Sequence, residues 1–271
     1  IIDEKTLCIF VSQSGETADT LAALRLSKSH GARTLAISNV IGSTITREAD
    51  YTIYTHAGPE IAVASTKAYT SQVCLIAMLG IYFAELLGSY SKDELEKLKA
   101  DILDLPSKIE AVLDNSEEIK TFASKVYTQK DMFFLGRGTD YNVALEGSLK
   151  LKEISYIHSE AYAAGELKHG PIALIENGVT VIGIITNKEL VEKTISNMQE
   201  VITRGAKTLI ITNQILPNNN FGYVINIPET NELISPILSV IPLQLLSYYI
   251  SKNKGLDVDK PRNLAKSVTV E

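Results

Sequence analysis

The stretch GARTLAISN, residues 31–39, recurs almost unchanged as GAKTLIITN at residues 205–213. In both copies a glycine precedes a short apolar run, a pattern typical of a helix end followed by a buried strand. A looser match at a similar offset links DYTIYTHAGPE (50–60) to GYVINIPETNE (222–232). The sequence therefore predicts two copies of one structural unit within this chain.

Strands alternate with helices around the first copy of the repeat. Apolar, β-branched runs predict strands at 7–11, 34–38 and 51–55, and helical spacing of apolar residues predicts helices at 16–30 and 65–87. Such alternation is typical of βαβ units. We therefore expect an α/β protein of two domains, each a flavodoxin-like parallel sheet of five strands flanked by helices.

The second copy contains a leading unit that the first copy lacks. Its strand at 179–185 corresponds to the strand at 7–11, but it is preceded by a strand at 132–135, the turn GRGTDY (136–141) and a helix from Asn142. With the second copy as template, we expect the first domain to be truncated by roughly forty residues, and the chain to start inside a longer product.

A polar, charge-rich stretch separates the two copies. Residues 89–130 show helical spacing but no strand, which indicates helical connectors at a domain boundary. The predicted organisation is a first domain at 1–90, a connector at 91–130, a second domain at 131–254 and a C-terminal tail at 255–271.

Composition and charge exclude several classes of protein. The 271 residues, 45% hydrophobic and 21% charged, are typical of a globular protein, and the net charge of −6 argues against a nucleic-acid partner. The most apolar segment, 234–250, is interrupted by two prolines, so we expect no membrane partner. Cys8 and Cys74 lack metal-ligand spacing, which indicates free thiols in a cytoplasmic protein. We expect no metal and no cofactor.

The segment SQSGET (12–17) follows the first predicted strand and opens a helix. Its hydroxyls, its flexible Gly15 and the free N–H groups of a helix N-terminus are suited to cradle a phosphate. The absence of a Walker lysine argues against a nucleoside triphosphate. The alternative is a simple helix cap by Ser14, and the motif alone leaves the two interpretations about even. Its place at the carboxyl end of a parallel strand favours the phosphate.

Four further segments contain polar groups that could serve a reaction. In VASTKAYT (63–70), Ser65 and Lys67 could add a donor and a charge, although helix capping and a solvated lysine explain them equally. Glu146, Lys150 and Glu153 share one helix face, which is typical of a solvated ion-pair stripe or of a group that faces a cleft.

The helix is followed by an alanine- and glycine-rich stretch that we expect to be a loop. It contains four ionisable residues, Glu160, Glu166, Lys168 and His169. Histidine has the pKa needed to move protons near neutral pH. Lys266 lies in a terminal segment of small residues, where a solvated, disordered tail is the default interpretation.

Four ordered motifs resemble one family. They are SQSGETADTLAAL, GPEIAVASTKAYTSQ, GRGTDYNVALEGSLKLKEISYIHSEAYAAGELKHGP and DKPRNLAKSVTVE. Together they span nearly the whole chain and closely resemble the isomerase half of the glutamine–fructose-6-phosphate aminotransferases. That half consists of two sugar-isomerase (SIS) domains.

The resemblance implies roles for individual residues. A phosphate site is implied for Ser12, Gln13, Ser14 and Thr17. A sugar site is implied for Val63, Ser65 and Ala265, with Ala64 and Lys67 nearby, and the tail would close it. Glu153 would move a proton between C1 and C2 with Lys150 assisting, and Lys266 would form a Schiff base with the open-chain ketose. His169 would open the sugar ring, in the family from the neighbouring subunit.

The implied activity is conversion of fructose 6-phosphate and ammonia into glucosamine 6-phosphate, the first step of UDP-N-acetylglucosamine synthesis, by a homodimer. The family's glutaminase domain, which releases the ammonia, is absent from this chain, so we expect at most isomerisation between ketose and aldose phosphates from the chain alone. One alternative is a non-catalytic SIS module that senses a phosphosugar. Another is a deglycase, which should not have so complete a match to the tail motif.

Overall fold

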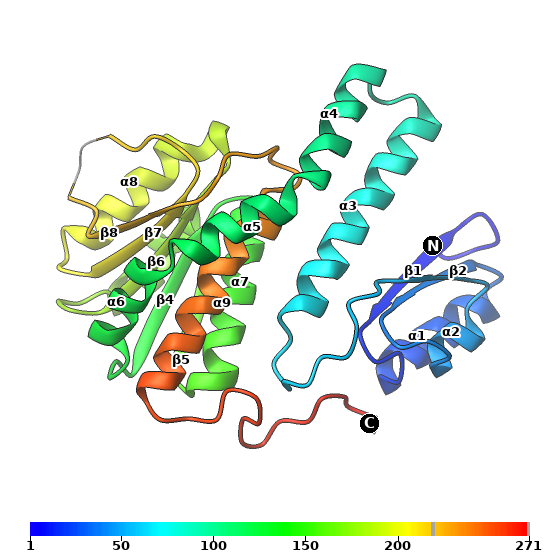
Figure 1. Cartoon of the computed structure of the whole chain (residues 1–271), viewed down its shortest axis with the longest axis horizontal. Helices are drawn as coiled ribbons and strands as arrows, with labels where there is room; N and C mark the ends of the chain where they lie inside the picture. The colour runs from blue at the N-terminus through cyan, green and yellow to red at the C-terminus, as the bar shows by residue number, and fades with distance from the viewer. Residues whose placement is uncertain (218–219, 270–271) are drawn as a thin grey trace. The chain divides into compact units, whose positions relative to one another are not determined.

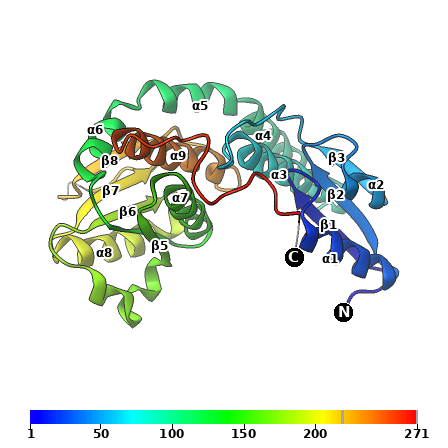
Figure 2. The same cartoon turned by 90° about the horizontal axis from the view of Figure 1, so that it is seen from below.

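The computed structural model describes residues 1–217 and 220–269 (Figures 1 and 2). Contacts divide the chain into two compact units, and the C-terminal segment belongs to the first: residues 1–76 with 262–271 form one unit, and residues 77–261 form the other. The last two residues of the tail motif, Val270 and Glu271, lie outside the described part of the chain.

The first unit is a parallel sheet with helices packed on it. Three strands pair in the order β1-β2-β3: β1 (Leu7–Ser12), β2 (Arg33–Ser38) and β3 (Tyr51–Tyr54). The helices α1 (Ala18–Ser29) and α2 (Thr44–Glu48) supply the buried Leu24 and Ile45, which form a small core with Ala36 of β2. Because both sheet connections pass through a helix, all three strands end at the same edge of the sheet.

The second unit contains a five-stranded parallel sheet in the order β5-β4-β6-β7-β8. Its strands are β4 (Asp131–Gly136), β5 (His158–Ala163), β6 (Thr180–Ile185), β7 (Lys207–Thr212) and β8 (Tyr223–Asn226). β6 and β7 are almost wholly buried, as expected for central strands of a sheet covered on both faces. The order is that of a flavodoxin-like sheet.

Helices cover both faces of this second sheet. Helix α8 (Val191–Ile202) packs on one face with the short helix η1 (Ala164–His169), and Figure 2 shows α8 on the opposite side of the sheet from α6 and α9. The other helices of the second unit are α4 (Lys92–Leu103), α5 (Leu105–Asp114), α6 (Glu117–Val126), α7 (Thr139–Ser155), α9 (Ser235–Asn253), η2 (Pro171–Leu174) and η3 (Lys188–Leu190). Gly147 lets α7 approach α9 closely, because a Cβ there would lie 2.5 Å from Leu243 Cδ1.

The predicted alternation of strands and helices is confirmed, and the stretch between the two copies contains α4, α5 and α6. The first sheet has three strands among the described residues and no counterpart of β4 or β5 there, in agreement with the truncated first copy that the sequence predicts.

Three details differ from the prediction. Helix α7 starts at Thr139 and not at Asn142, because the turn already ends at Gly138, whose φ of 57° glycine tolerates. Glu160 lies on the edge strand β5 and not in a loop. Pairing with β4 holds this segment extended although its small residues have little preference for a strand. Ser65 precedes the long helix, since α3 (Lys67–Leu87) begins two residues later.

Helix α3 is apolar and largely uncovered within the chain. It is long and apolar enough to span a membrane by length and composition, whereas 234–250, which the sequence analysis ranks as the most apolar segment, is not in that class. Only 11% of the most apolar stretch of α3 is buried within the chain. Length and composition alone are weak evidence for a membrane span, and an uncovered apolar helix fits a protein interface equally well.

Candidate functional site

The loop 12–17 connects β1 to α1 and folds around its own hydroxyl oxygens. Gly15 N donates to Ser12 Oγ at 3.0 Å, and Glu16 N donates to Ser14 Oγ at 3.2 Å. Since Ser14 Oγ accepts from the loop, its O–H remains available to donate outward, and the Ser12 and Thr17 hydroxyls lie 3.5 Å apart as a pair in which either can donate. Gly15 has φ of 70°, and a Cβ there would lie 2.1 Å from Ser43 Oγ, so glycine is required at this turn.

The loop before α1 has free backbone donors. Its N-cap is Thr17, which makes no side-chain cap hydrogen bond, so capping by Ser14 does not explain the motif. Among the described residues, the N–H groups of Gln13 and Ser14 have no protein acceptor. A helix N-terminus with unsatisfied N–H groups favours an anion.

A second polar cluster lies in the loop that leads from β3 to α3, and its centre is Glu60. The Glu60 carboxylate accepts from Thr66 N at 2.8 Å, from Ser65 Oγ at 3.1 Å and from Ala68 N at 3.3 Å. It therefore caps the start of α3. The sequence analysis did not select Glu60, although a carboxylate shortly before a helix start is a recognisable capping signal.

Lys266 joins this cluster from the C-terminal tail. Its Nζ donates to Glu60 Oε2 at 2.8 Å and to Ala62 O at 2.7 Å. The Glu60 side chain is 4% exposed and that of Lys266 is 30% exposed. Burial by itself would raise the pKa of Glu60, but the hydrogen bonds from Lys266, Thr66 N and Ala68 N outweigh it, so the pKa is lowered below its ordinary value of 4.5.

The tail also contacts the start of α1, directly after the loop 12–17, which we call the cradle loop. Val268 O accepts from Ala18 N, the first residue of α1, at 3.4 Å, and Figure 2 shows the C-terminal trace beside β1 and α1. Lys266 is thus part of an ordered segment and is not on a solvated tail. The other residues of the implied sugar site differ in exposure: Ala64 is buried, Val63 is half-buried, and Lys67 and Ala265 are exposed.

In the second unit, α7 carries a buried ion-pair cluster. Lys150 Nζ lies 2.8 Å from Glu153 Oε2 and 3.3 Å from Glu146 Oε1. The exposed fractions of the side chains are 4% for Lys150, 23% for Glu153 and 13% for Glu146. Burial raises the pKa of Glu146, against the opposing effect of Lys150. A solvated stripe does not account for a lysine held this deeply between two carboxylates.

His169 ends η1 and is exposed. Among the described residues, no hydrogen bond or ion pair joins His169 to Lys150 or Glu153. Of its predicted neighbours, Lys168 pairs with Glu200 at 2.9 Å, and Glu160 accepts a hydrogen bond from Tyr162 Oη, whose pKa is raised to about 12 by burial and by that carboxylate.

Comparison with known proteins places these features in a family. A family model described as the SIS domain matches residues 1–82 and 125–251. The chain belongs to the SIS-domain family. It is 62% identical over 273 residues to a glutamine–fructose-6-phosphate aminotransferase (isomerizing) of Clostridium tetani and 60% identical over 275 residues to that of Clostridium perfringens.

A solved structure extends the match. The C-terminal domain of glucosamine-fructose-6-phosphate aminotransferase from Francisella tularensis superposes with a TM-score of 0.92 at 40% identity, covering 96% of this chain and 75% of that one. This SIS-domain chain therefore corresponds to the C-terminal part of these aminotransferases. It spans 45% of the length of the two clostridial proteins and all of it aligns with them.

The predicted residues of the SIS-domain chain divide between the two compact units. The first unit holds Ser12, Gln13, Ser14, Thr17, Val63, Ser65, Ala265 and Lys266, and the second unit holds Lys150, Glu153 and His169. Within the described residues, no group of three or more side chains is arranged to hold a metal ion.

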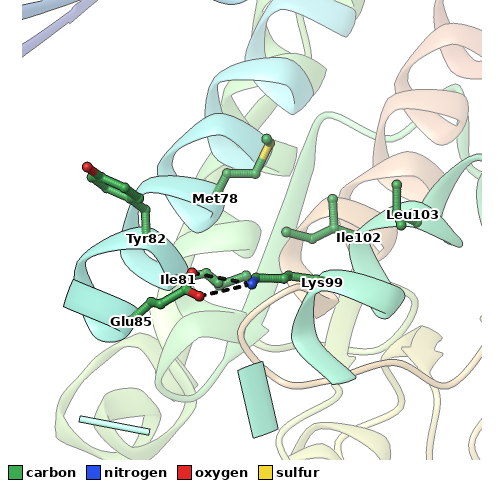
Figure 3. Close-up of a pocket in the computed structure, with 7 residues that line it drawn as sticks. All are labelled: Met78, Ile81, Tyr82, Glu85, Lys99, Ile102 and Leu103. Atoms are coloured by element: carbon green, nitrogen blue, oxygen red, sulfur yellow. Dashed lines mark hydrogen bonds and ion pairs between the residues drawn. The ribbon is translucent and has the colours of Figure 1, made fainter. Parts of the chain in front are cut away.

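A pocket elsewhere on the SIS-domain chain contains none of the predicted site residues. It lies between α3 and α4 and has a volume of about 320 Å³ (Figure 3). Its lining is Met78, Ile81, Tyr82, Glu85, Lys99, Ile102 and Leu103, with an ion pair between Lys99 and Glu85 at 3.3 Å. This lining is apolar apart from one ion pair. It contains none of the residues to which the resemblance assigns an acid–base role.

Proposed function

We propose that the chain binds fructose 6-phosphate and performs the sugar-isomerising part of a glutamine–fructose-6-phosphate aminotransferase reaction. One observation carries the proposal: the donor-rich loop after β1 and the amine of Lys266 lie at the same edge of the first sheet. The tail that contains Lys266 contacts both the start of α1 and Glu60. Ligands of open α/β sheets bind at the carboxyl ends of the strands. The relatives' names supply the substrate.

The phosphate occupies the loop 12–17. The N–H groups of Gln13 and Ser14 and the hydroxyls of Ser12, Ser14 and Thr17 donate to its oxygens, and the N-terminus of α1 adds partial positive charge. Val63, Ser65 and Ala265 line the sugar. This arrangement suits a phosphate monoester, because it presents donors in a compact loop.

Lys266 forms an imine with the substrate. Its neutral amine adds to C2 of the open-chain ketose, and loss of water leaves a C2=N bond. Glu60, whose Oε2 lies 2.8 Å from Nζ, holds the amine in place, and the ammonium first releases its proton to solvent. Ammonia then adds to the imine carbon and expels the lysine amine, so the new C2=N nitrogen is that of ammonia.

Glu153 moves the proton between C1 and C2. The carboxylate removes a proton from C1, the C–H electron pair forms a C1=C2 bond, and the C2=N electrons move to nitrogen. When C2 regains a proton, the C1 hydroxyl loses its own, which leaves an aldehyde at C1 and an amine at C2. Lys150, 2.8 Å from Glu153, orients this carboxylate and balances its charge. Without ammonia, the same residues interconvert ketose and aldose phosphates.

His169 opens the sugar ring of the neighbouring subunit in a homodimer. Its exposure supports delivery to a partner, and the exposed apolar side chains of α3, such as Tyr82, Leu86 and Leu87, support an interface. Light scattering at micromolar protein should give twice the chain mass, and a strictly monomeric species would refute this part of the proposal.

The reaction belongs to the first step of UDP-N-acetylglucosamine synthesis. Both cysteines, Cys8 and Cys74, are free thiols, which supports a cytoplasmic enzyme. A phosphosugar sensor needs the cradle but neither the buried Lys150 cluster nor the held amine of Lys266, so the enzyme is the better supported of the two functions.

The deciding experiment is reductive trapping. The chain is incubated with fructose 6-phosphate and borohydride, and its peptides are mapped by mass. We expect a reduced hexose-phosphate adduct on Lys266, lost in Lys266→Arg and kept in the matched control Lys5→Arg, which changes an exposed lysine of the same unit. Saturable binding of the sugar phosphate by calorimetry without any adduct would favour the sensor instead.

A further inference from the structure

The loop after β6 in the second unit occupies the position that the cradle loop has in the first. The strands of the two sheets run in equivalent register: the last residue of β1, Ser12, pairs with Ser38, and the last residue of β6, Ile185, pairs with Thr212. The next two residues after each strand therefore correspond, Gln13 with Thr186 in particular.

The following strands repeat the same relation. Thr55 N, just after β3, donates to Ser38 O at 3.0 Å, and Ile227 N, just after β8, donates to Thr212 O at 2.8 Å. β1-β2-β3 and β6-β7-β8 are thus two copies of one sheet edge. An anion loop in one copy has a structural counterpart in the other.

The counterpart loop already holds an anionic group of the chain itself. Asp140, the second residue of α7, accepts from Thr186 N at 2.8 Å, from Thr186 Oγ1 at 2.5 Å and from Asn187 N at 3.3 Å. Asp140 is only 2% exposed. Its carboxylate thus receives two successive backbone N–H groups and one hydroxyl, which is the donor set that a phosphate oxygen receives in such loops.

The first loop differs in this one respect. The N–H groups of Gln13 and Ser14, which correspond to those of Thr186 and Asn187, have no protein acceptor within residues 1–217 and 220–269. We propose that the loop after β6 is a phosphate-type anion site that the carboxylate of Asp140 fills permanently. The loop after β6 then takes no phosphate from solution.

The turn after β4 is built to bring Asp140 into this position. A Cβ on Gly136 would lie 2.4 Å from both the carbonyl carbon and the carbonyl oxygen of Asp140, so only glycine at the end of β4 lets the start of α7 come this close. A phosphate could enter only by displacing a buried carboxylate of like charge, which opposes binding both by volume and by repulsion.

Chemical rescue separates a filled anion site from an ordinary structural hydrogen bond. In Asp140→Ala the two backbone donors lose their acceptor and a small space opens beside them. We expect the melting temperature to fall by about 5–10 °C and about 50 mM formate or phosphate to restore at least half of the loss. Sodium chloride at equal ionic strength should restore nothing, and wild type should gain only about 1–2 °C from the same anions.

Two further variants keep the test decisive if Asp140→Ala does not fold. Asp140→Asn retains the shape without the charge and leaves no space, so anions should not rescue it beyond the wild-type gain. Asp140→Ser retains a polar side chain, and phosphate calorimetry should count one site more per chain than in wild type.

Loss of stability in Asp140→Ala with no anion-specific recovery, together with no added phosphate site in Asp140→Ser, would overturn the inference. The outcome is independent of the proposed function. If wild type binds no phosphate, the cradle of the first unit fails, whereas a site gained in Asp140→Ser would still support the filled site of the second.

Discussion

Replacing Glu60 by Gln tests how Lys266 is held. Lys266 has two acceptors, the Glu60 carboxylate and Ala62 O, and only the first is charged. In Glu60→Gln the amide oxygen can still accept from Thr66 N, but the amide NH2 replaces the oxygen that faces the ammonium. The helix start is thus kept and the charged contact to the tail is lost.

The magnitude follows from that single contact. A hydrogen bond between charged groups contributes about 1.5–3 kcal/mol, and the 30% exposure of the Lys266 side chain places it toward the lower end. A loss of about 2 kcal/mol lowers the melting temperature by about 4–8 °C. If the same ~2 kcal/mol no longer holds the amine in its reactive position, imine trapping in Glu60→Gln slows about 30-fold.

The pH dependence identifies the charge as the cause. The pKa of Glu60 is lowered in the folded chain, so its contribution to stability is complete above the ordinary value of 4.5 and is lost as the pH falls through the folded value. The difference in melting temperature between wild type and Glu60→Gln should therefore be constant from pH 6 to 8 and shrink below about 4.5.

The assays are thermal unfolding across pH and the rate of borohydride trapping with fructose 6-phosphate. Glu4→Gln, an exposed carboxylate of the same unit, is the matched control and should change neither. An unchanged trapping rate in Glu60→Gln, or a stability difference that persists unaltered to pH 3, would refute the reasoning.

Three other substitutions test separate parts of the account. Gly15→Ala should destabilise the first unit by about 1–3 kcal/mol and abolish phosphate binding by calorimetry, because its Cβ would collide with Ser43 Oγ and its φ is 70°; near-native binding would contradict this. Glu153→Gln should reduce isomerisation at least about 100-fold while imine trapping continues; equal loss of both would point to a structural role. The pKa of Asp50 is lowered to about 2 by Lys28 and by hydrogen bonds of Thr34, so Asp50→Asn should lower stability at pH 7 and cost little below pH 2, measured by thermal unfolding; the same loss at both values would exclude the charge as the cause.

Local patterns in the sequence were sufficient for the sheet architecture and selected most of the candidate site residues. The repeated strand at 31–39 and 205–213 predicted two parallel α/β copies, because apolar runs between helices report burial directly. The loop 12–17 was predicted from its hydroxyls and Gly15, and Lys150 was predicted to share a helix face with Glu153, since helical spacing determines that face. The edge strand β5 was missed, because its small residues have little strand preference and only pairing with β4 holds them extended.

By itself, then, the sequence determined the order of elements, the parallel topology and the residue types at each strand end, all of which depend on neighbours close along the chain. Only the tertiary structure decided which of those residues meet. Glu60 and Lys266 are 206 residues apart, and their contact holds an apparent solvated tail against the loop before α3. Asp140 and Thr186 are 46 residues apart, and their contact gives the loop after β6 an internal acceptor that the loop 12–17 lacks. Burial and hydrogen-bond partners of this kind come from packing between distant segments, which no local pattern encodes.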